Sequence, residues 1–520
     1  DTAAGAILTI NGVISGDGPL TKQGYDTVVL AGANTYTGPT TVESGTLQIG
    51  AVNALPVGTS LTTGPAGLFD LNGFDQQVAT IQNSSTDGGY ITNSSVDIHN
   101  LTVGNSNDTA FTYGGTLLGS LALVKTGSDN FTLTGTNTYI GGTIINGGAV
   151  TVSQDDNLGQ SGTTVSFNGG TLAITTGFGT DRPMTLSGAG TIDVAAGQTL
   201  VASGVISGSG SLTMVDTGSL NLMANNTFTG GLVVDAGTVN GAAIAGGGSP
   251  LGGPTGNITL AGGTLNLVSG GVSTTTALNS MIVSGNSNLN IAGTAGVNTY
   301  LSGQTFSRSA GTTLTVSTSG TGLLGSDDKV LFATAPAPEN AVLAGVVVNT
   351  GASISLATYD SVGGQGIIPF NSFTETNNIN ADASYPANSY LARATSVDNT
   401  LDSTSGFATT PNGALTRAWA SLQDNGQTIT QASGENWTLL IGDGTNPGNL
   451  VLQAGSIIQS NLGGGTLTLA FGGSEGVISA SGTASISSVI TGTSGVTVGG
   501  TGTVVLSGTN TFTGGVFLSG

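Results

Sequence analysis

The chain has 520 residues, of which 89 are glycine and only 7% are charged, against about 25% in an ordinary globular protein. Seven basic against 28 acidic residues give a net charge of −21, which excludes an extended phosphate-binding surface and therefore nucleic acid as a partner. With 37% hydrophobic residues and a mean hydropathy of +0.23, the chain is expected to fold, and no apolar run is long enough for a membrane-spanning helix. Cysteine is absent, so neither disulfides nor thiolate metal sites hold the fold together.

Short strands of about four to six residues are predicted from the amino terminus onward, beginning with 6–10, 28–30, 40–42 and 45–49. In each, β-branched and other apolar residues alternate with polar ones, and turns rich in glycine, asparagine and aspartate bound them. This is the pattern of half-buried β-strands, and no long helical periodicity competes with it. The sequence therefore predicts an all-β protein.

One turn motif, Asn-Thr-(Tyr/Phe)-x-Gly, occurs four times. Its asparagines are Asn34, Asn137, Asn226 and Asn510, and its glycines are Gly38, Gly141, Gly230 and Gly514. Recurrence of such phrases over hundreds of positions predicts a β-solenoid, an elongated rod in which each coil stacks on the one before. The four asparagines should then occupy equivalent turns, each followed by an aromatic residue in the same environment. We expect asparagine and glycine there because tight corners often require a positive φ.

An array of β-sandwich domains is the main alternative to a solenoid. Immunoglobulin-like units would repeat about every 100 residues around a buried tryptophan, and the first three motif copies are spaced in a way that fits this. Trp419 and Trp437, however, both fall outside the motif copies, and shorter echoes fill every interval between them. The solenoid is therefore the favoured interpretation.

The segment 327–447 differs from its flanks, because it holds six prolines and many aromatic residues. We therefore predict solenoid repeats over 1–326 and 448–520, with this less regular segment between them. One interpretation is an excursion that covers a flank of the solenoid, with the aromatic side chains packed beneath it. A second is a surface that binds a sugar or a protein partner, and a third is a small inserted domain. The second would use Trp419, Trp437, Tyr385 and Tyr390 as ligand contacts.

Residues that could support catalysis are few and scattered. His99 is the only histidine and lies in an alternating strand pattern, which favours a structural or solvated side chain. The carboxylate pairs at 155–156 and 327–328 are adjacent residues, which point to opposite faces when they lie on a strand. We therefore predict no catalytic residues, no enzyme activity and no cofactor. A structural calcium ion is compatible with the surplus of oxygen ligands, although no calcium-binding sequence motif is present.

The phrases Leu20-Thr-Lys22-x-Gly24, Asn34-Thr-Tyr36-Thr-Gly38 and Gly45-Thr-Leu47 resemble the autotransporter-associated β-strand repeat, also called the passenger-associated transport repeat. The most complete match runs from 147 to 241, and clear matches cover about half of the chain. The resemblance implies a right-handed parallel β-helix that is secreted or displayed on a bacterial cell surface.

From these observations we expect a non-enzymatic extracellular structural rod, a stalk or fibre segment. The alternative is an adhesin that binds a glycan or a surface receptor through 327–447, and a polysaccharide lyase or hydrolase ranks third. Neither end of the sequence supplies a capping element, which solenoids require. We therefore expect either a longer native chain or end-to-end self-association into filaments.

Overall fold

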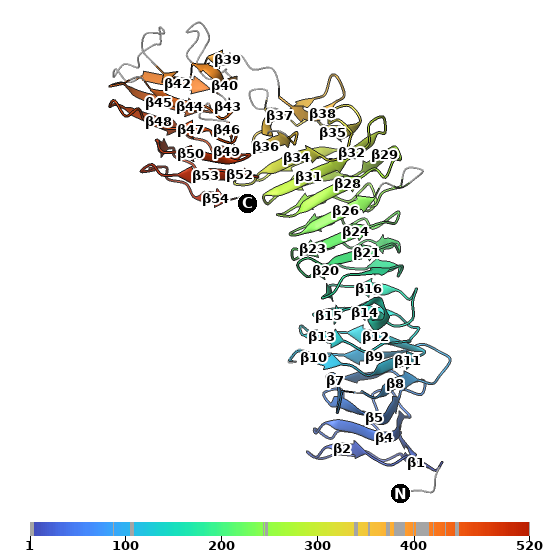
Figure 1. Cartoon of the computed structure of the whole chain (residues 1–520). Coiled ribbons are helices and arrows are strands. Elements are labelled where there is room, and N and C mark those ends of the chain that lie inside the picture. Colours follow the sequence, from blue (N-terminus) through green and yellow to red (C-terminus); the bar gives the residue numbers. More distant parts are fainter. Residues whose placement is uncertain are drawn as a thin grey trace. The chain divides into compact units, whose positions relative to one another are not determined.

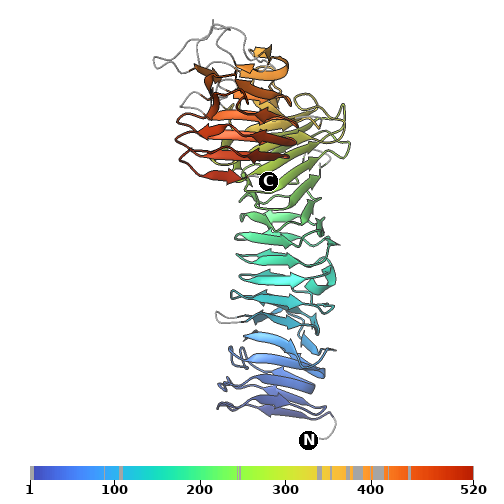
Figure 2. The same ribbon diagram turned by 60° about the vertical axis from the view of Figure 1, so that its left-hand side comes forward.

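The computed structural model describes residues 5–86, 88–104, 109–242, 244, 248–336, 342–351, 354–370, 375–378, 391–398, 400–401, 415–419, 421–431, 433–442 and 447–518. The chain divides into two compact units. Unit 1 comprises Asp1–Ile244 and Gly248–Gly256, and unit 2 comprises Ala245–Gly247 and Asn257–Gly520. In both units short strands stack as successive rungs (Figures 1 and 2).

The strands of unit 1 are short and are separated by turns. In chain order they are β1 (Ile7–Ile10), β2 (Leu20–Lys22), β3 (Thr27–Leu30), β4 (Thr40–Ile49), β5 (Ser60–Asp70), β6 (Gln76–Val78), β7 (Thr80–Asn83), β8 (Tyr90–Asn93), β9 (His99–Val103), β10 (Phe111–Tyr113), β11 (Thr116–Gly119), β12 (Leu121–Lys125), β13 (Asn130–Leu133), β14 (Thr143–Ile145), β15 (Ala149–Val152), β16 (Val165–Phe167), β17 (Thr171–Ile174), β18 (Phe178–Thr180), β19 (Met184–Leu186), β20 (Gly190–Val194), β21 (Thr199–Ala202), β22 (Ile206–Gly208), β23 (Leu212–Val215), β24 (Ser219–Leu222), β25 (Leu232–Val234) and β26 (Thr238–Ala242). Within the described residues the only helical element is the 3-10 helix η1 (Asp155–Leu158).

These strands form the faces of a solenoid. One sheet joins β1-β3-β4-β5-β8-β11, a second β6-β9-β12-β14-β16-β19-β22, a third includes β10-β13-β15-β17-β20-β23-β25, and a fourth includes β18-β21-β24-β26. Neighbouring strands are parallel, and each pairs with the strand at the same position one coil further on. A strand between two neighbours satisfies its backbone groups on both edges, so the interior of the stack leaves no free strand edge.

The core of unit 1 consists of apolar columns that run from coil to coil. In the third sheet one such column is formed by Phe131, Val150, Leu172, Ile192, Met214 and Val234, whose side chains are all buried. The residues between them alternate to the outer face and are mostly threonine and other polar residues. Strand side chains point alternately to the two faces of a sheet. The apolar residues of the alternating sequence pattern therefore point into the solenoid, and the polar residues point outward.

Unit 2 contains two stacks of strands. The first stack, 257–370, consists of β27 (Ile258–Leu260), β28 (Thr264–Val268), β29 (Thr274–Ala277), β30 (Ser280–Val283), β31 (Ser287–Ala292), β32 (Thr299–Gly303), β33 (Thr305–Arg308), β34 (Leu314–Thr318), β35 (Asp328–Phe332), β36 (Val346–Asn349), β37 (Ile354–Asp360) and β38 (Gly366–Pro369). The second stack, 375–518, consists of β39 (Glu375–Asn378), β40 (Leu391–Asp398), β41 (Thr400–Leu401), β42 (Leu415–Trp419), β43 (Ser421–Asp424), β44 (Thr428–Gln431), β45 (Asn436–Ile441), β46 (Gly448–Leu452), β47 (Ile457–Ile458), β48 (Thr466–Ala470), β49 (Gly476–Ala480), β50 (Thr483–Ile486), β51 (Val489–Thr491), β52 (Val496–Gly500), β53 (Thr503–Leu506) and β54 (Val516–Leu518).

An antiparallel excursion ends the first stack. Strand β36 still pairs in parallel with β34, but β37 pairs antiparallel with β36 and β38 antiparallel with β37. This reversal interrupts the parallel rungs and covers the last of them, the usual way of protecting a sheet edge. The second stack then forms three parallel sheets, β39-β40-β43-β46-β49-β52-β54, β41-β44-β47-β50-β53 and β42-β45-β48-β51.

The two stacks of unit 2 pack side by side and run in opposite directions. Contacts join Gly345 to Asn449, Arg308 to Glu475 and Asn286 to Leu518, so rising residue numbers in the second stack meet falling numbers in the first. A small apolar core lies between them, formed by Val342, Val347, Ile354, Leu356, Phe370 and Val451. The second stack therefore lies against the flank of the first.

The structure confirms the prediction of an all-β parallel solenoid. Within 327–447, strand β35 continues the first stack, β36 to β38 form the antiparallel excursion, and β42 to β45 belong to the second stack. The division into compact units falls near residues 244–257. The bounds at 326 and 447 that we read from the sequence stay a prediction.

Candidate functional site

The four motif asparagines make one hydrogen bond in common. Each Oδ1 accepts a hydrogen bond from a backbone N–H of the preceding coil, twenty residues earlier in the sequence, at 2.7–3.0 Å. In three copies the Nδ2 also donates to a carbonyl of the following coil, at 2.6–2.8 Å. The asparagines of these three copies, Asn34, Asn137 and Asn226, are buried. One amide thus links three successive coils at a corner of the solenoid.

The backbone of these turns corrects the reason given from sequence. Positive φ among the described non-glycine residues occurs at Asn53, Asn72 and Asp216 and at none of the four motif asparagines. The motif glycines Gly38, Gly141, Gly230 and Gly514 also lack it. A Cβ at any of them would lie within about 2.6 Å of the backbone of the preceding coil. Asparagine is therefore used for its two-sided amide, and glycine for close approach between coils.

The aromatic residue of each motif fills the corner from inside. Tyr36, Tyr139 and Phe228 are buried, and Phe512 packs against the core of the second stack. The hydroxyls of Tyr36 and Tyr139 are hydrogen-bonded to Thr40 and Thr143, at 2.6 and 2.5 Å, and burial raises the pKa of both tyrosines. These rings therefore act as uncharged packing elements whose polar end is satisfied.

A buried lysine, which the sequence analysis named only as part of the phrase Leu20-Thr-Lys22-x-Gly24, occupies a second corner of the first two repeats. The Lys22 ammonium donates to three backbone carbonyl oxygens at 2.8–2.9 Å, and Lys125 donates to that of Thr126. Burial lowers the pKa of Lys22, against the opposing charge of Asp26. In the third repeat Met214 stands in this place. In all three repeats the end of the side chain approaches a glycine of the next coil, Gly45, Gly148 and Gly237. The recurring phrase Lys-x-Gly-x-Asp at 22–26 and 125–129 is the signal that could have identified this corner.

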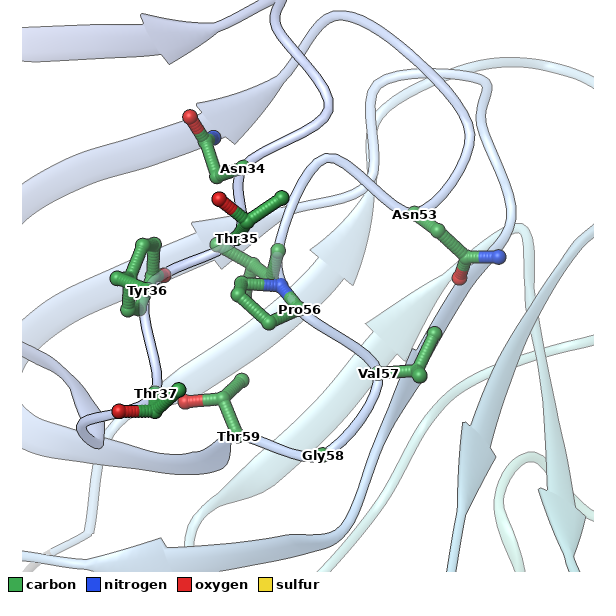
Figure 3. A pocket seen from close by; sticks show the side chains of 10 residues that line it. Asn34, Thr35, Tyr36, Thr37, Asn53, Pro56, Val57, Gly58 and Thr59 are labelled. Atoms are coloured by element: carbon green, nitrogen blue, oxygen red, sulfur yellow. The ribbon is translucent and has the colours of Figure 1, made fainter. Parts of the chain in front are cut away.

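A surface pocket of about 490 Å³ adjoins the first motif (Figure 3). Thr35, Tyr36 and Thr37 lie along one wall, and the loop 53–59 of the next coil forms the other. Thr35 and Thr37 are exposed, and of the described residues that line this pocket none is charged. The pocket offers hydroxyl and amide groups to a neutral ligand but no acid or base for catalysis.

The corresponding loop of the second repeat is held by a buried arginine. The Arg182 guanidinium donates to the Asp155 carboxylate at 2.9 Å and also to backbone carbonyls of the loop, among them those of Gly159 and Gln160. Asp155, which lies in the 3-10 helix η1, is thus a structural partner of Arg182. Sequence reasoning missed Arg182, and a lone arginine carries no repeat signal.

The remaining candidates for chemistry lie apart from one another. His99 Nδ1 lies 3.1 Å from Asp75 Oδ1 at the solenoid surface. Asp328 is fully buried, and burial raises the pKa of its carboxyl to about 6. Among the described residues no group of three or more His, Cys, Asp or Glu side chains is positioned to hold a metal ion. The structural calcium ion therefore stays a prediction.

The two tryptophans that we predicted as ligand contacts are buried. Trp419 is 0% and Trp437 1% exposed, and both belong to the core of the second stack. This corrects the prediction, because neither indole presents a face on which a ligand could stack. The strand register pairs Trp419 with Ile441 and Trp437 with Leu467, both of them buried, so the two rings lie in apolar columns. Tyr385 and Tyr390 lie outside the described residues.

Three comparisons with known proteins bear on this arrangement. The sequence model of the passenger-associated-transport-repeat family matches residues 20–49, 123–152, 208–240 and 496–520, and each match contains one motif asparagine. Over 204 residues the chain is 35% identical to a protein named adhesin BmaC autotransporter, from Brucella suis biovar 1 (strain 1330). That alignment covers 36% of this chain and 6% of the relative. No solved structure matches. The resemblance read from the sequence is thereby confirmed.

No helix in the described part of the chain has the length and apolar character that crossing a membrane requires.

Proposed function

We propose that this chain, which carries four passenger-associated transport repeats, is a non-enzymatic structural part of a passenger displayed on or released from a bacterial cell surface. The observation that carries the proposal is the asparagine corner, whose bond from Oδ1 to the preceding coil recurs in all four repeats. The similarity to an autotransporter adhesin supports the location. A stalk needs mechanical continuity between coils, and this corner supplies it.

The geometry suits a load-bearing solenoid. Each coil is joined to the next by parallel ladders on several faces and by apolar columns. At the four motif copies the asparagine amide adds a further bond between coils. Separating two coils would break these contacts together, because stability in such arrays resides largely in the interfaces between neighbours. The outer face is rich in threonine, serine and asparagine and poor in charge, a composition suited to prolonged exposure to water without strong attraction to other surfaces.

Surface display of the full-length protein tests this proposal. An epitope inserted beside Leu462, which is fully exposed, should be accessible to antibody on intact bacteria that produce the protein. Asn137→Ala and Asn226→Ala should lower the resistance of the displayed chain to added protease, because both remove bonds between coils. A chain that stays inside intact cells, or one that releases sugars from acidic polysaccharides, would contradict the proposal.

Adhesion is the second candidate function. The name of the relative favours it, and so does an uncharged trough in unit 2 whose lining is described below. Binding of the purified chain to a glycan array would support adhesion. The burial of Trp419 and Trp437 moves the expected ligand surface away from these two residues. An adhesive role would be contradicted if the displayed protein left attachment of the bacteria to host cells unchanged.

A further inference from the structure

Polar side chains form two columns on the outer face of the first stack in unit 2. The strand register places Asn266, Asn290, Ser317 and Asn349 in one column, and Thr264, Asn288 and Thr315 in the other. Successive members come from successive coils, so they are spaced by the distance between strands, about 4.8 Å. The columns therefore present a repeating set of amide and hydroxyl groups along the stack axis.

The second stack turns this face into a trough. Gly500, Thr501 and Leu518 line one hollow of about 460 Å³ together with residues of the columns, and Thr501 also lines a second hollow of about 440 Å³. Asn288, Thr315 and Thr501 border both hollows, so the two hollows are neighbours along the stack.

Specific contacts hold the opposite wall in place. Arg308 Nη2 donates to Glu475 Oε2 at 3.0 Å, and both side chains are about nine-tenths buried. The other Glu475 oxygen accepts from the Gly311 N–H and the Thr497 hydroxyl, and Asn286 Nδ2 donates to the Leu518 carbonyl at 2.9 Å. A buried ion pair whose two carboxylate oxygens both accept hydrogen bonds favours one defined arrangement of the two stacks.

We propose that this trough binds an extended, uncharged glycan chain. Of the described residues that line it, none is charged, although the whole chain carries a net charge of −21. Amides and hydroxyls each donate and accept hydrogen bonds, as the hydroxyls of neutral sugars require. The coil spacing is close to the length of one sugar ring in an extended polysaccharide, so successive rings meet amide or hydroxyl groups of successive coils.

The contacts within the trough divide its residues into two roles. Asn290 donates to Ser319 at 2.7 Å and accepts from Ser317 at 3.2 Å, so it holds the column in position. Asn288 and Thr501 are exposed on opposite walls, and the Asn288 amide makes only a long contact of 3.4 Å with Thr264. Asn288 and Thr501 are therefore the residues assigned to ligand contact.

Glycan binding by the purified full chain tests the assignment. The probes are neutral oligosaccharides of increasing length from β-glucan, dextran and mannan. Sialyllactose and polygalacturonate serve as charged glycan probes, and denatured gelatin serves as a peptide probe. We expect at least one neutral series to bind with an affinity that rises with chain length. Asn288→Ala and Thr501→Ala should each weaken that binding about tenfold, the effect of losing a ligand hydrogen bond of about 1.4 kcal/mol.

The matched control lies in unit 1. Asn221 and Asn240 form the same kind of amide ladder on the outer face of β24 and β26, with Asn240 donating to Asn221 at 2.7 Å. The Asn221→Ala/Asn240→Ala variant should bind the neutral glycan as the parent does. Arg308→Ala, which releases the opposite wall, should weaken binding while leaving unit 1 folded.

Binding only to charged probes or to gelatin would overturn the inference, and so would an absence of binding to every neutral series. Equal losses in the trough variants and the unit 1 control would overturn it as well. The inference rests on the proposed extracellular exposure, which the antibody experiment on intact cells measures independently. A displayed chain without glycan binding contradicts the trough assignment alone.

Discussion

Replacing Asn137 by alanine removes the amide that links three coils. Its Oδ1 accepts from the Leu117 N–H at 2.8 Å, and its Nδ2 donates to the Asn157 carbonyl at 2.6 Å. Asn137 is 2% exposed and Leu117 and Asn157 are fully buried, so water does not replace the lost partners. A buried polar group left unpaired costs about 1–3 kcal/mol. With two such groups, Asn137→Ala should destabilise the coils around it by roughly 2–6 kcal/mol.

Local hydrogen exchange is the appropriate assay, because long repeat arrays do not unfold in a single two-state transition. The amide of Leu117 should lose most of its protection in the variant. Asn146→Ala is the control, since Asn146 is an exposed residue of the same solenoid and should change stability by less than about 0.5 kcal/mol. Equal protection in the two variants would refute the role assigned to the amide.

Asn137→Asp provides a second measurement. The carboxylate keeps an acceptor for the Leu117 N–H but loses the donor to Asn157 and places a charge in a buried site. Burial disfavours the charged form and raises the pKa of such a carboxyl. The variant should therefore be least stable above that pKa, and it should regain stability as the pH falls and the neutral acid forms. A destabilisation independent of pH would contradict the reasoning that this corner disfavours the charged form of the side chain.

Three further changes test other parts of the solenoid. Gly141→Ala would place a Cβ 2.6 Å from the Leu121 carbonyl oxygen and should lower the free energy of unfolding by at least about 2 kcal/mol, measured by thermal or denaturant unfolding. At Gly179 no atom lies within 4 Å of an added Cβ, so Gly179→Ala should be neutral or slightly stabilising. Equal effects of the two substitutions would contradict this prediction. Lys125→Met should cost about 1–2 kcal/mol less than Lys125→Ala, because methionine keeps the corner filled, and the reverse order would exclude a packing role. Burial raises the pKa of Asp424 to about 7, so the folded chain binds a proton that the unfolded chain releases near pH 4. The free energy of unfolding should therefore fall as the pH rises from about 4 to 7 and then level off. Asp424→Asn should flatten this dependence in unfolding experiments from pH 4 to 9. An unchanged pH profile in the variant would refute the role assigned to Asp424.

The sequence by itself determined the fold class and the repeating corner. In a parallel solenoid each strand residue pairs with a residue about one coil away in the sequence. The alternation of the strands and the asparagine and glycine of each turn are therefore enough to indicate which residues stack. The bond from Asn137 to Leu117 spans 20 residues, as do its equivalents in the other copies. Periodicity therefore revealed which residues stack.

Only the tertiary structure decided the direction of particular side chains and the meeting of distant coils. Trp419 and Trp437 belong to the types that often contact ligands, yet the register of their strands turns them into the core. The pairing of Arg308 with Glu475 spans 167 residues and belongs to no repeat. A single ion pair between two stacks leaves no periodic trace in the sequence, so the trough beside it became visible only once the two stacks were placed together.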